Sequence, residues 1–220
     1  MHIGILGAGQ TGATIGRLWC QAGHQVLFGT RHPERLAALV QSIGADASAG
    51  TPREAAEFGE VILLAVPLKA VPELAKELAP LLTNKTVLDA SNPSPDRDGE
   101  VGREAIGEGR GSSKWTASKL PGARVVKAFN MQRVDALQTE AHRADDRLAI
   151  ALAGDDFSAL GAAKQLVEDA GFDPVIVGSL EDGRAFDPGT RYYATGIHAS
   201  ALRQEMGETQ AMLRAAQEAR

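Results

Sequence analysis

Three glycines near the N-terminus form the pattern that most clearly suggests a chemistry. Gly7, Gly9 and Gly12 make a G-x-G-x-x-G turn between an apolar run, residues 2–6, and a segment with apolar residues at helical spacing, residues 13–22. In such a turn the first glycine permits the tight bend, the second lets the backbone approach a pyrophosphate, and the third lets the helix pack closely on the strand. The N–H groups at the helix N-terminus then face the phosphates. The residues predicted to bind a dinucleotide here are Gly7, Gly9, Gln10, Thr11 and Gly12. A glycine-rich turn without a ligand is the alternative.

The residues after the second predicted strand, 25–29, indicate which dinucleotide fits. An NAD-binding unit usually carries Asp or Glu at this point to bind the ribose hydroxyls. This chain instead has Thr30, Arg31 and Arg35. Arginine can bind a phosphate through two parallel hydrogen bonds, so the pattern predicts a 2′-phosphate and favours NADP over NAD. The alternative is an ordinary basic turn exposed to solvent.

Later strand ends are predicted beside the nicotinamide half of the cofactor. Residues 61–66 are a continuous apolar run that ends at a proline, and residues 86–90 form the next strand. Such runs are typical of strands buried on both faces of a parallel sheet. Ligands of open α/β sheets bind beyond the carboxyl ends of the strands. The residues placed there are Ala65, Val66, Pro67, Leu68, Asn92 and Pro93. A further strand, 123–130, ends at the same edge with Asn130, which either contacts the bound rings or caps a helix beginning near Val134.

The alternation of strands and helices predicts an α/β fold with a Rossmann-type, doubly wound, mostly parallel sheet. Two more strands, at 148–153 and 174–177, and a helix at 157–170 predict a small C-terminal α/β extension, followed by a helical tail. We therefore expect an NADP-binding Rossmann domain over residues 1–150. Residues 151–220 are expected to complete the substrate pocket.

Two segments depart from this regular alternation. Residues 96–119 are rich in glycine and charge and lack periodicity, which predicts a long loop that is either functional or a disordered surface excursion. The tail, residues 191–220, is predicted to be helical, with Ile197, Leu202, Met206, Met212 and Leu213 on a mixed face. These apolar residues exceed what a free helix in water would carry. We therefore expect the tail to dock on the second subunit of a homodimer.

The composition restricts the partners of the protein. The chain of 220 residues has a net charge of -5 and 44% apolar residues, which gives no basic field to attract nucleic acid or an anionic membrane. No apolar run approaches the roughly 20 residues that span a bilayer. The single cysteine, Cys20, cannot form an internal disulfide and is expected to pack in the core. A cytoplasmic protein that acts on a small molecule is expected.

Catalytic side chains are not evident from the sequence. It contains no obvious Ser/His/Asp set, and its histidines are scattered without metal-ligand spacing. No metal and no catalytic residue are therefore predicted. His198 is the histidine that a folded-over tail would bring to the pocket, and a surface or packing role is its alternative.

With these segments in place, the chain resembles the NADPH-dependent F420 reductase family, also called F420-dependent NADP oxidoreductases. It is most similar to the bacterial branch described as dinucleotide-binding reductases. The resemblance extends from residue 2 to about Tyr193. The segments that carry it are the glycine turn and residues 30–31, 35, 65–67, 92–95, 97–100, 120–130 and 171–174. Among these, the Lys-Ala-Phe-Asn block at 127–130 is the more specific.

The resemblance implies an NADP(H)-dependent oxidoreductase in which hydride passes directly between NADP and a deazaflavin ring. It implies that Thr30, Arg31 and Arg35 hold the 2′-phosphate. It also implies a nicotinamide site lined by Val66, Pro67, Leu68 and Ala128. The cofactor carries this chemistry, so the protein needs alignment and dryness more than acid–base groups.

The second substrate is less defined. Residues 92–95 and 129–130 differ from the segments that face the deazaflavin in the archaeal members of the family, and residues 190–205 are more polar. The acceptor therefore stays open between coenzyme F420 and a flavin. The residues expected to contact it are Pro93, Asn130 and His198.

Two other functions remain open. A dehydrogenase of the 3-hydroxyacid or pyrroline-carboxylate-reductase kind shares the nucleotide-binding half but adds a large helical domain, for which only the tail is available. A non-catalytic NADP sensor would keep the 2′-phosphate site and lack a second pocket, and fold alone does not exclude it.

Overall fold

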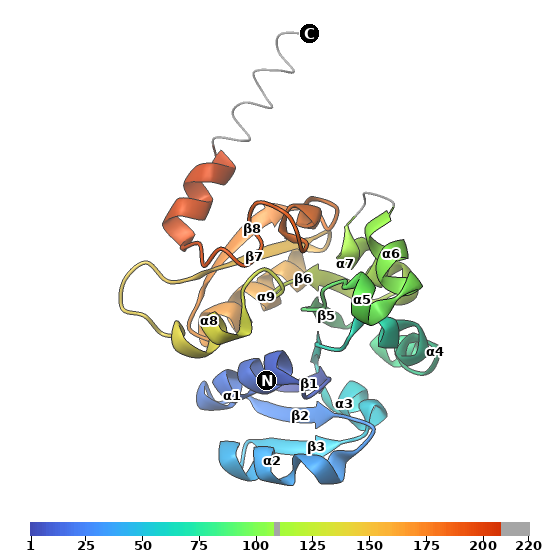
Figure 1. Cartoon of the computed structure of the whole chain (residues 1–220). Coiled ribbons are helices and arrows are strands. Elements are labelled where there is room, and N and C mark those ends of the chain that lie inside the picture. Colours follow the sequence, from blue (N-terminus) through green and yellow to red (C-terminus); the bar gives the residue numbers. More distant parts are fainter. Residues whose placement is uncertain (108–110, 208–220) are drawn as a thin grey trace.

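The computed structural model describes residues 1–107 and 111–207. Within these residues, eight strands form one sheet in the order β3-β2-β1-β4-β5-β6-β7-β8, with helices on both of its faces (Figure 1). The strands are β1 His2–Leu6, β2 Gln25–Gly29, β3 Ala47–Gly50, β4 Val61–Leu64, β5 Thr86–Asp89, β6 Arg124–Lys127, β7 Ala149–Gly154 and β8 Asp173–Gly178. Neighbouring strands are parallel except for β6 and β7. The predicted Rossmann-type α/β fold is confirmed.

Helices fill most of the connections between the strands. The α-helices are α1 Gln10–Gln21, α2 Ala37–Ile43, α3 Pro52–Phe58, α4 Val71–Leu82, α5 Pro95–Asp98, α6 Glu100–Gly107, α7 Ser112–Lys119, α8 Val134–Thr139 and α9 Phe157–Asp169. The 3₁₀ helices are η1 Pro33–Leu36, η2 Leu68–Ala70 and η3 Asp182–Phe186. Residues 199–207 are also helical.

The sheet is buried between apolar clusters on its two faces. On one face, Trp19 of α1 packs against β1 and β2, and its indole Nε1 donates a hydrogen bond of 2.7 Å to the carbonyl of Leu166 in α9. Helix α1 lies very close to the sheet, because a Cβ atom on Gly16 would stand 2.5 Å from the Phe28 ring. The other face packs mainly against α3 and α4. This close packing fixes the N-terminus of α1 beside the end of β1.

The prediction of a long loop over residues 96–119 is wrong. The structure places α5, α6 and α7 there, and residues 108–110 lie outside the described part of the chain. Helix α7 buries Ser112, Ser113 and Thr116 rather than an apolar stripe. A helix whose buried face is polar has no apolar periodicity, so the sequence pattern does not reveal it. Strand β3 was also missing from the predicted elements, since its residues Ala-Ser-Ala-Gly have low strand propensity.

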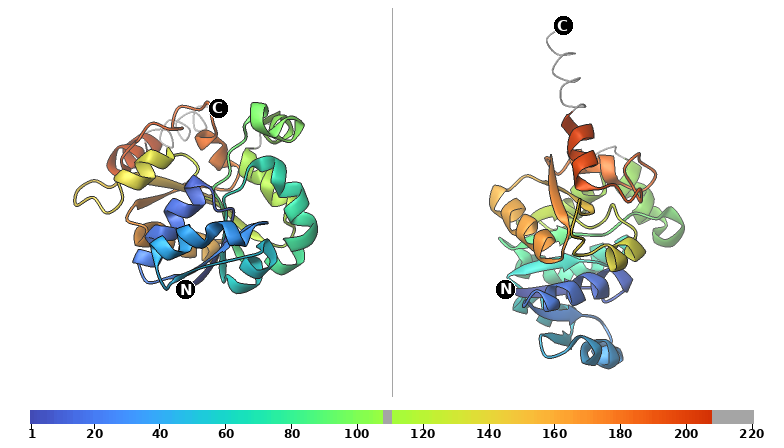
Figure 2. Two further views of the ribbon diagram at one scale, coloured as in Figure 1. Left: turned by 60° about the horizontal axis from the view of Figure 1, so that its bottom comes forward. Right: turned by 90° about the vertical axis from the view of Figure 1, so that its left-hand side faces the viewer.

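The C-terminal part continues the same sheet. The predicted boundary between residues 150 and 151 falls inside β7, so the sheet runs across it. The helical residues 199–207 lie by the β7–β8 part of the molecule, far from β2 and β3 (Figure 2), and bury Ala199 and Leu202. The predicted apolar positions Met212 and Leu213 lie outside the described residues. No helix in the described ranges is long and apolar enough to cross a membrane.

Candidate functional site

The strand register brings the predicted site residues to one edge of the sheet. Leu6 at the end of β1 pairs with Leu64 of β4, which pairs with Asp89 of β5, which pairs with Lys127 of β6. The chain segments that follow these four residues therefore emerge side by side. They are the glycine turn, residues 65–68, residues 90–93 and residues 128–130.

The three glycines of the turn are required for different reasons. Gly7 has a φ of +105°, and a Cβ atom on it would lie 2.5 Å from the Ala65 carbonyl oxygen. A Cβ atom on Gly12 would lie 2.1 Å from the Gly7 carbonyl oxygen. A Cβ atom on Gly9 would meet nothing within 4 Å, and this residue is the N-cap of α1, where no described side chain caps the helix. The fold needs Gly7 and Gly12, whereas the space and the uncapped N–H groups at Gly9 fit a pyrophosphate.

A hollow of about 470 Å³ lies on one side of the β4 end. Its lining includes the cations Arg31 and Lys69, the hydroxyl of Thr30 and the carboxylate of Glu73, together with apolar residues. Arg31 and Lys69 are exposed, and neither side chain has an ion pair in the described part of the chain. Two cations and a hydroxyl around one hollow fit a 2′-phosphate.

Arg35 differs from the other residues predicted for this phosphate. It lies in η1 with an exposed side chain and does not line the hollow. Lys69, which was not among the residues predicted from the sequence, does line the hollow. Its position directly after Pro67 and Leu68 at the end of a buried strand was the available signal.

A second hollow, of about 260 Å³, lies on the other side of the β4 end. Its lining residues are Gly9, Gln10, Thr11, Ala65, Val66, Pro67, Ala90, Ser91, Asn92 and Arg97. Val66 and Pro67 line both hollows. The two hollows therefore form one path that leads from Arg31, past the α1 N-terminus, to Asn92. An extended dinucleotide has this shape, with its phosphates in the middle.

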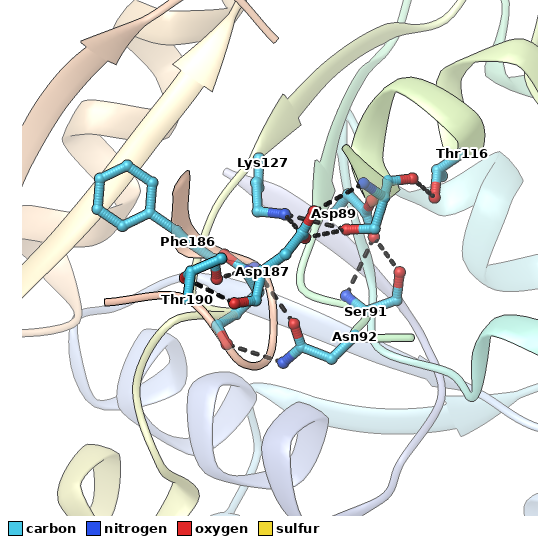
Figure 3. Close-up of polar contacts among 10 residues, drawn as sticks. Asp89, Ser91, Asn92, Thr116, Lys127, Phe186, Asp187 and Thr190 are labelled. Carbon is cyan, nitrogen blue, oxygen red and sulfur yellow. Dashed lines mark hydrogen bonds and ion pairs between the residues drawn. The ribbon is translucent and has the colours of Figure 1, made fainter. Parts of the chain in front are cut away.

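Asn130 lies behind Asn92 rather than in the hollow. Its side chain is 1% exposed, and its Nδ2 donates to Asn92 Oδ1 at 3.3 Å and to the Phe186 carbonyl at 3.4 Å. Asn92 Nδ2 in turn donates to the Asn130 carbonyl at 2.8 Å (Figure 3). The alternative that Asn130 caps α8 is wrong, because the N-cap of that helix is Arg133. Asn130 therefore orients the Asn92 amide from beneath.

The backbone at Phe129 helps to place Asn130. Phe129 has a φ of +62°, which is uncommon for a residue with a side chain. Its buried ring is held by edge-on contacts to Trp19 and Phe172, with ring centroids 5.8 and 6.4 Å away. These core contacts stabilise the turn that points Asn130 toward Asn92.

A buried polar cluster supports the same strand ends. Lys127 is 2% exposed, forms an ion pair with Asp187, and donates to Ser112 Oγ at 3.0 Å (Figure 3). Ser112 donates to Asp187 through its backbone N–H at 3.1 Å and its hydroxyl at 2.5 Å. The cluster ties α7 and the segment after η3 to β6. Nothing in the periodicity predicted it, although a lysine that ends the apolar run Val125-Val126 was visible.

The remaining predicted residues are less accessible or lie elsewhere. Leu68 and Ala128 are fully buried, and Pro93 is buried. His198 forms an isolated bridge with Leu148, and its Nδ1 lies 2.5 Å from the Asp146 carbonyl. None of these four residues lines either hollow. Their contacts to cofactor or substrate stay predictions.

Arg97 is the charged residue of the smaller hollow, and the sequence reasoning did not single it out. Its Nε and Nη2 donate to the two carboxylate oxygens of Asp98, at 3.0 and 2.7 Å, and Nη2 also donates to the Asn92 carbonyl at 2.6 Å. Asp98 accepts from the backbone N–H groups of Ser94 at 2.9 Å and Lys69 at 3.3 Å. Burial would raise the pKa of Asp98, but these hydrogen bonds outweigh burial and hold the pKa below its ordinary value.

Comparison with known proteins agrees with this site. Residues 2–93 match the model of the family described as NADP oxidoreductase coenzyme F420-dependent. Metalloreductase STEAP3 of Rattus norvegicus is 31% identical over 182 residues, which cover 83% of this chain and 35% of the length of STEAP3. F420-dependent NADP reductase of Methanothermobacter marburgensis is 28% identical over 199 residues, which cover 85% of this chain and 88% of that protein.

The structural comparison concerns the fold. A hypothetical protein from Sinorhizobium meliloti has a TM-score of 0.76 to this chain at 24% identity, covering 90% of this chain and 94% of the other. The resemblance predicted from the sequence is confirmed: residues 2–93 of this chain match the model of coenzyme F420-dependent NADP oxidoreductases, and F420-dependent NADP reductases are among its relatives.

Proposed function

We propose that the protein oxidises NADPH by passing hydride directly to a flavin-like acceptor, either coenzyme F420 or a flavin. The observation that carries this proposal is the path formed by the two hollows, which has cations at one end and a small, mostly uncharged space at the other. The path lies where open α/β sheets bind their ligands. A two-ring hydride transfer needs a shaped space that aligns the rings more than it needs an acid or a base.

Each part of the path has a role in this proposal. Thr30, Arg31 and Lys69 bind the 2′-phosphate, and the N–H groups after Gly9 bind the pyrophosphate. When NADPH is bound, its nicotinamide supplies the hydride. Asn92, held by Asn130, lies at the nicotinamide end and orients the ring. Among the described residues that line the smaller hollow, Arg97 alone is charged.

The test is NADPH consumption followed at 340 nm with F420, FMN, FAD or ferric ion, each added separately. Ferric ion belongs in the series because the relative STEAP3 is named a metalloreductase. We expect oxidation with F420 or a flavin, and slower oxidation of NADH. Binding of NADPH without consumption by any acceptor would contradict the proposal and favour the sensor. Reduction of NADP by a 3-hydroxyacid or an amino acid, with no flavin reaction, would favour the dehydrogenase.

The assembly and location complete the proposal. We propose a homodimer in the cytoplasm whose residues 151–220 complete the substrate pocket. A third core cluster, at β7 and β8, includes Phe186, Ala199 and Leu202, and it supports this role because η3 and the helical residues 199–207 pack there. Phe186 also accepts the hydrogen bond from Asn130. The C-terminal part thereby contacts the nicotinamide end of the path through a buried residue.

A further inference from the structure

The guanidinium of Arg97 is held in one orientation, and some of its N–H donors remain unpaired among the described residues. Its Nε and both hydrogens of Nη2 are used by Asp98 and the Asn92 carbonyl. The side chain of Asp98 is fully buried, while that of Arg97 is 44% exposed. Nη1 has no partner among the described residues, and an arginine has two N–H groups at that nitrogen. A fixed cation with two free donors lines the smaller hollow.

The position of Arg97 distinguishes it from the pyrophosphate site. In the proposed function, the uncapped N–H groups of α1 bind the pyrophosphate at the Gly9 side of the hollow. Arg97 follows β5 and contacts Asn92, at the nicotinamide end. The nicotinamide and its ribose carry no negative charge that would pair with a guanidinium. Tyr193, from the segment after η3, is close enough to Arg97 to influence its pKa, although the hydrogen bond with Asp98 has the larger effect.

We propose that Arg97 binds an anionic group of the acceptor, a phosphate, and so selects phosphorylated flavins over their neutral counterparts. This inference rests on the proposed function. An arginine N–H donates a charge-assisted hydrogen bond to phosphate, and a guanidinium held by a buried carboxylate loses little freedom when it does so. The two free N–H groups at Nη1 are the donors. Asp98 is a positioning residue, since it acts on the acceptor through Arg97, and the Asn92 carbonyl holds Arg97 in the same way.

The experiment compares FMN with riboflavin, which differ by one phosphate. Each is titrated into the protein saturated with NADP⁺, and binding is followed by quenching of flavin fluorescence, so that no turnover is needed. We expect FMN to bind about tenfold more tightly, which corresponds to about 1.4 kcal/mol. Because Arg97 is partly exposed, added salt should reduce this preference. Arg97→Ala should abolish the preference by weakening FMN binding and leave riboflavin binding unchanged.

The chain offers a matched control. Arg133 also forms a two-point pair with a nearby aspartate, Asp135, but lines a different hollow. Arg133→Ala removes the same charge and should keep the FMN preference. Since Arg97→Ala leaves a buried carboxylate without its cation, the double variant Arg97→Ala/Asp98→Asn is made in parallel. It should fold and still show equal affinity for the two flavins.

Three outcomes would overturn the inference. Equal binding of FMN and riboflavin by the unmodified protein is one, and an FMN preference that survives both Arg97 variants is another. The third is a large loss of NADPH affinity in Arg97→Ala, with the flavin preference intact, which would assign the anion to the cofactor. Failure of the proposed function looks different: no acceptor would oxidise NADPH, while the Arg97-dependent preference in the binding titration would persist.

Discussion

Cofactor preference gives the sharpest test of the larger hollow. Arg31 and Lys69 line it with their cationic side chains, and Arg35 lies outside it. The three substitutions Arg31→Ala, Lys69→Ala and Arg35→Ala each remove one positive charge, the first two from the hollow and the third from outside it. They therefore separate a contact to the 2′-phosphate from a general loss of positive potential.

The magnitude follows from the exposure of these side chains. A hydrogen bond to a charged group contributes about 1.5–3 kcal/mol. Arg31 and Lys69 are exposed, so water and salt place them at the lower end of that range. Two contacts of about 1.5 kcal/mol give an NADPH preference over NADH on the order of one hundredfold. Arg31→Ala should reduce this preference about tenfold or more and leave NADH affinity nearly unchanged.

The assay is a fluorescence titration of NADPH and NADH with each variant at fixed ionic strength. Lys69→Ala should also lower the preference, and Arg35→Ala should change it by less than about twofold, as expected for a distant charge in salt. Equal affinities of the unmodified protein for the two cofactors would refute the assignment of the hollow. A loss in Arg35→Ala as large as that in Arg31→Ala would restore Arg35 to the 2′-phosphate site, and an unchanged preference in Lys69→Ala would refute the role given to Lys69.

Three further predictions concern the supports of the site and the assembly. Asn130→Ala should lower the NADPH oxidation rate while the NADPH dissociation constant changes by less than about threefold. Asn92→Ala should lower the rate to the same extent, and the double variant no further; a lower melting temperature with an unchanged rate would count against this. Lys127→Met should lower the free energy of unfolding in urea by about 3–5 kcal/mol, because Asp187 loses its buried cation, and Lys127→Met/Asp187→Leu should recover most of that loss. Light scattering at micromolar concentration should give the mass of a dimer, and a monomer mass would contradict the predicted homodimer.

The sequence predicts the fold well where burial is apolar. The runs at β1, β4 and β5 lie between apolar clusters, so their hydrophobic pattern reports directly on the sheet. The glycine turn is equally easy to recognise, because a Cβ atom on two of its glycines would lie only 2.1 and 2.5 Å from backbone oxygens, while the third faces open space at the helix N-terminus. The positions of Thr30 and Arg31 are also predictable, because they come directly after β2 and the strand register sets where that strand ends.

The pattern fails where burial is polar. Helix α7 is buried through Ser112, Ser113 and Thr116, and Lys127 is buried through its pairing with Asp187. Serine, threonine and lysine are usually exposed, so the type of each residue alone predicts a position on the surface. Their burial depends on partners up to 75 positions away in the sequence, as in the bond from Ser112 to Asp187. A single sequence does not reveal such pairs, so only the structure identifies the buried polar residues that hold the strand ends of the site.

Arg97 and Asp98 show how a local motif can mislead in the same way. Neighbouring side chains on a regular helix point in different directions, so an Arg-Asp dipeptide predicts two solvated charges. Here α5 ends at Asp98, and Gly99, with a φ of +61°, reverses the chain directly after it. That short helix lets Asp98 turn inward to the N–H groups of Ser94 and Lys69 and lets Arg97 lie across it. The Asp98 carboxylate joins α5 to η2, which carries Lys69 of the proposed 2′-phosphate site. The same buried carboxylate also holds Arg97 at the other end of the proposed cofactor site. A change at Asp98 should therefore disturb both cofactor preference and the orientation of Arg97.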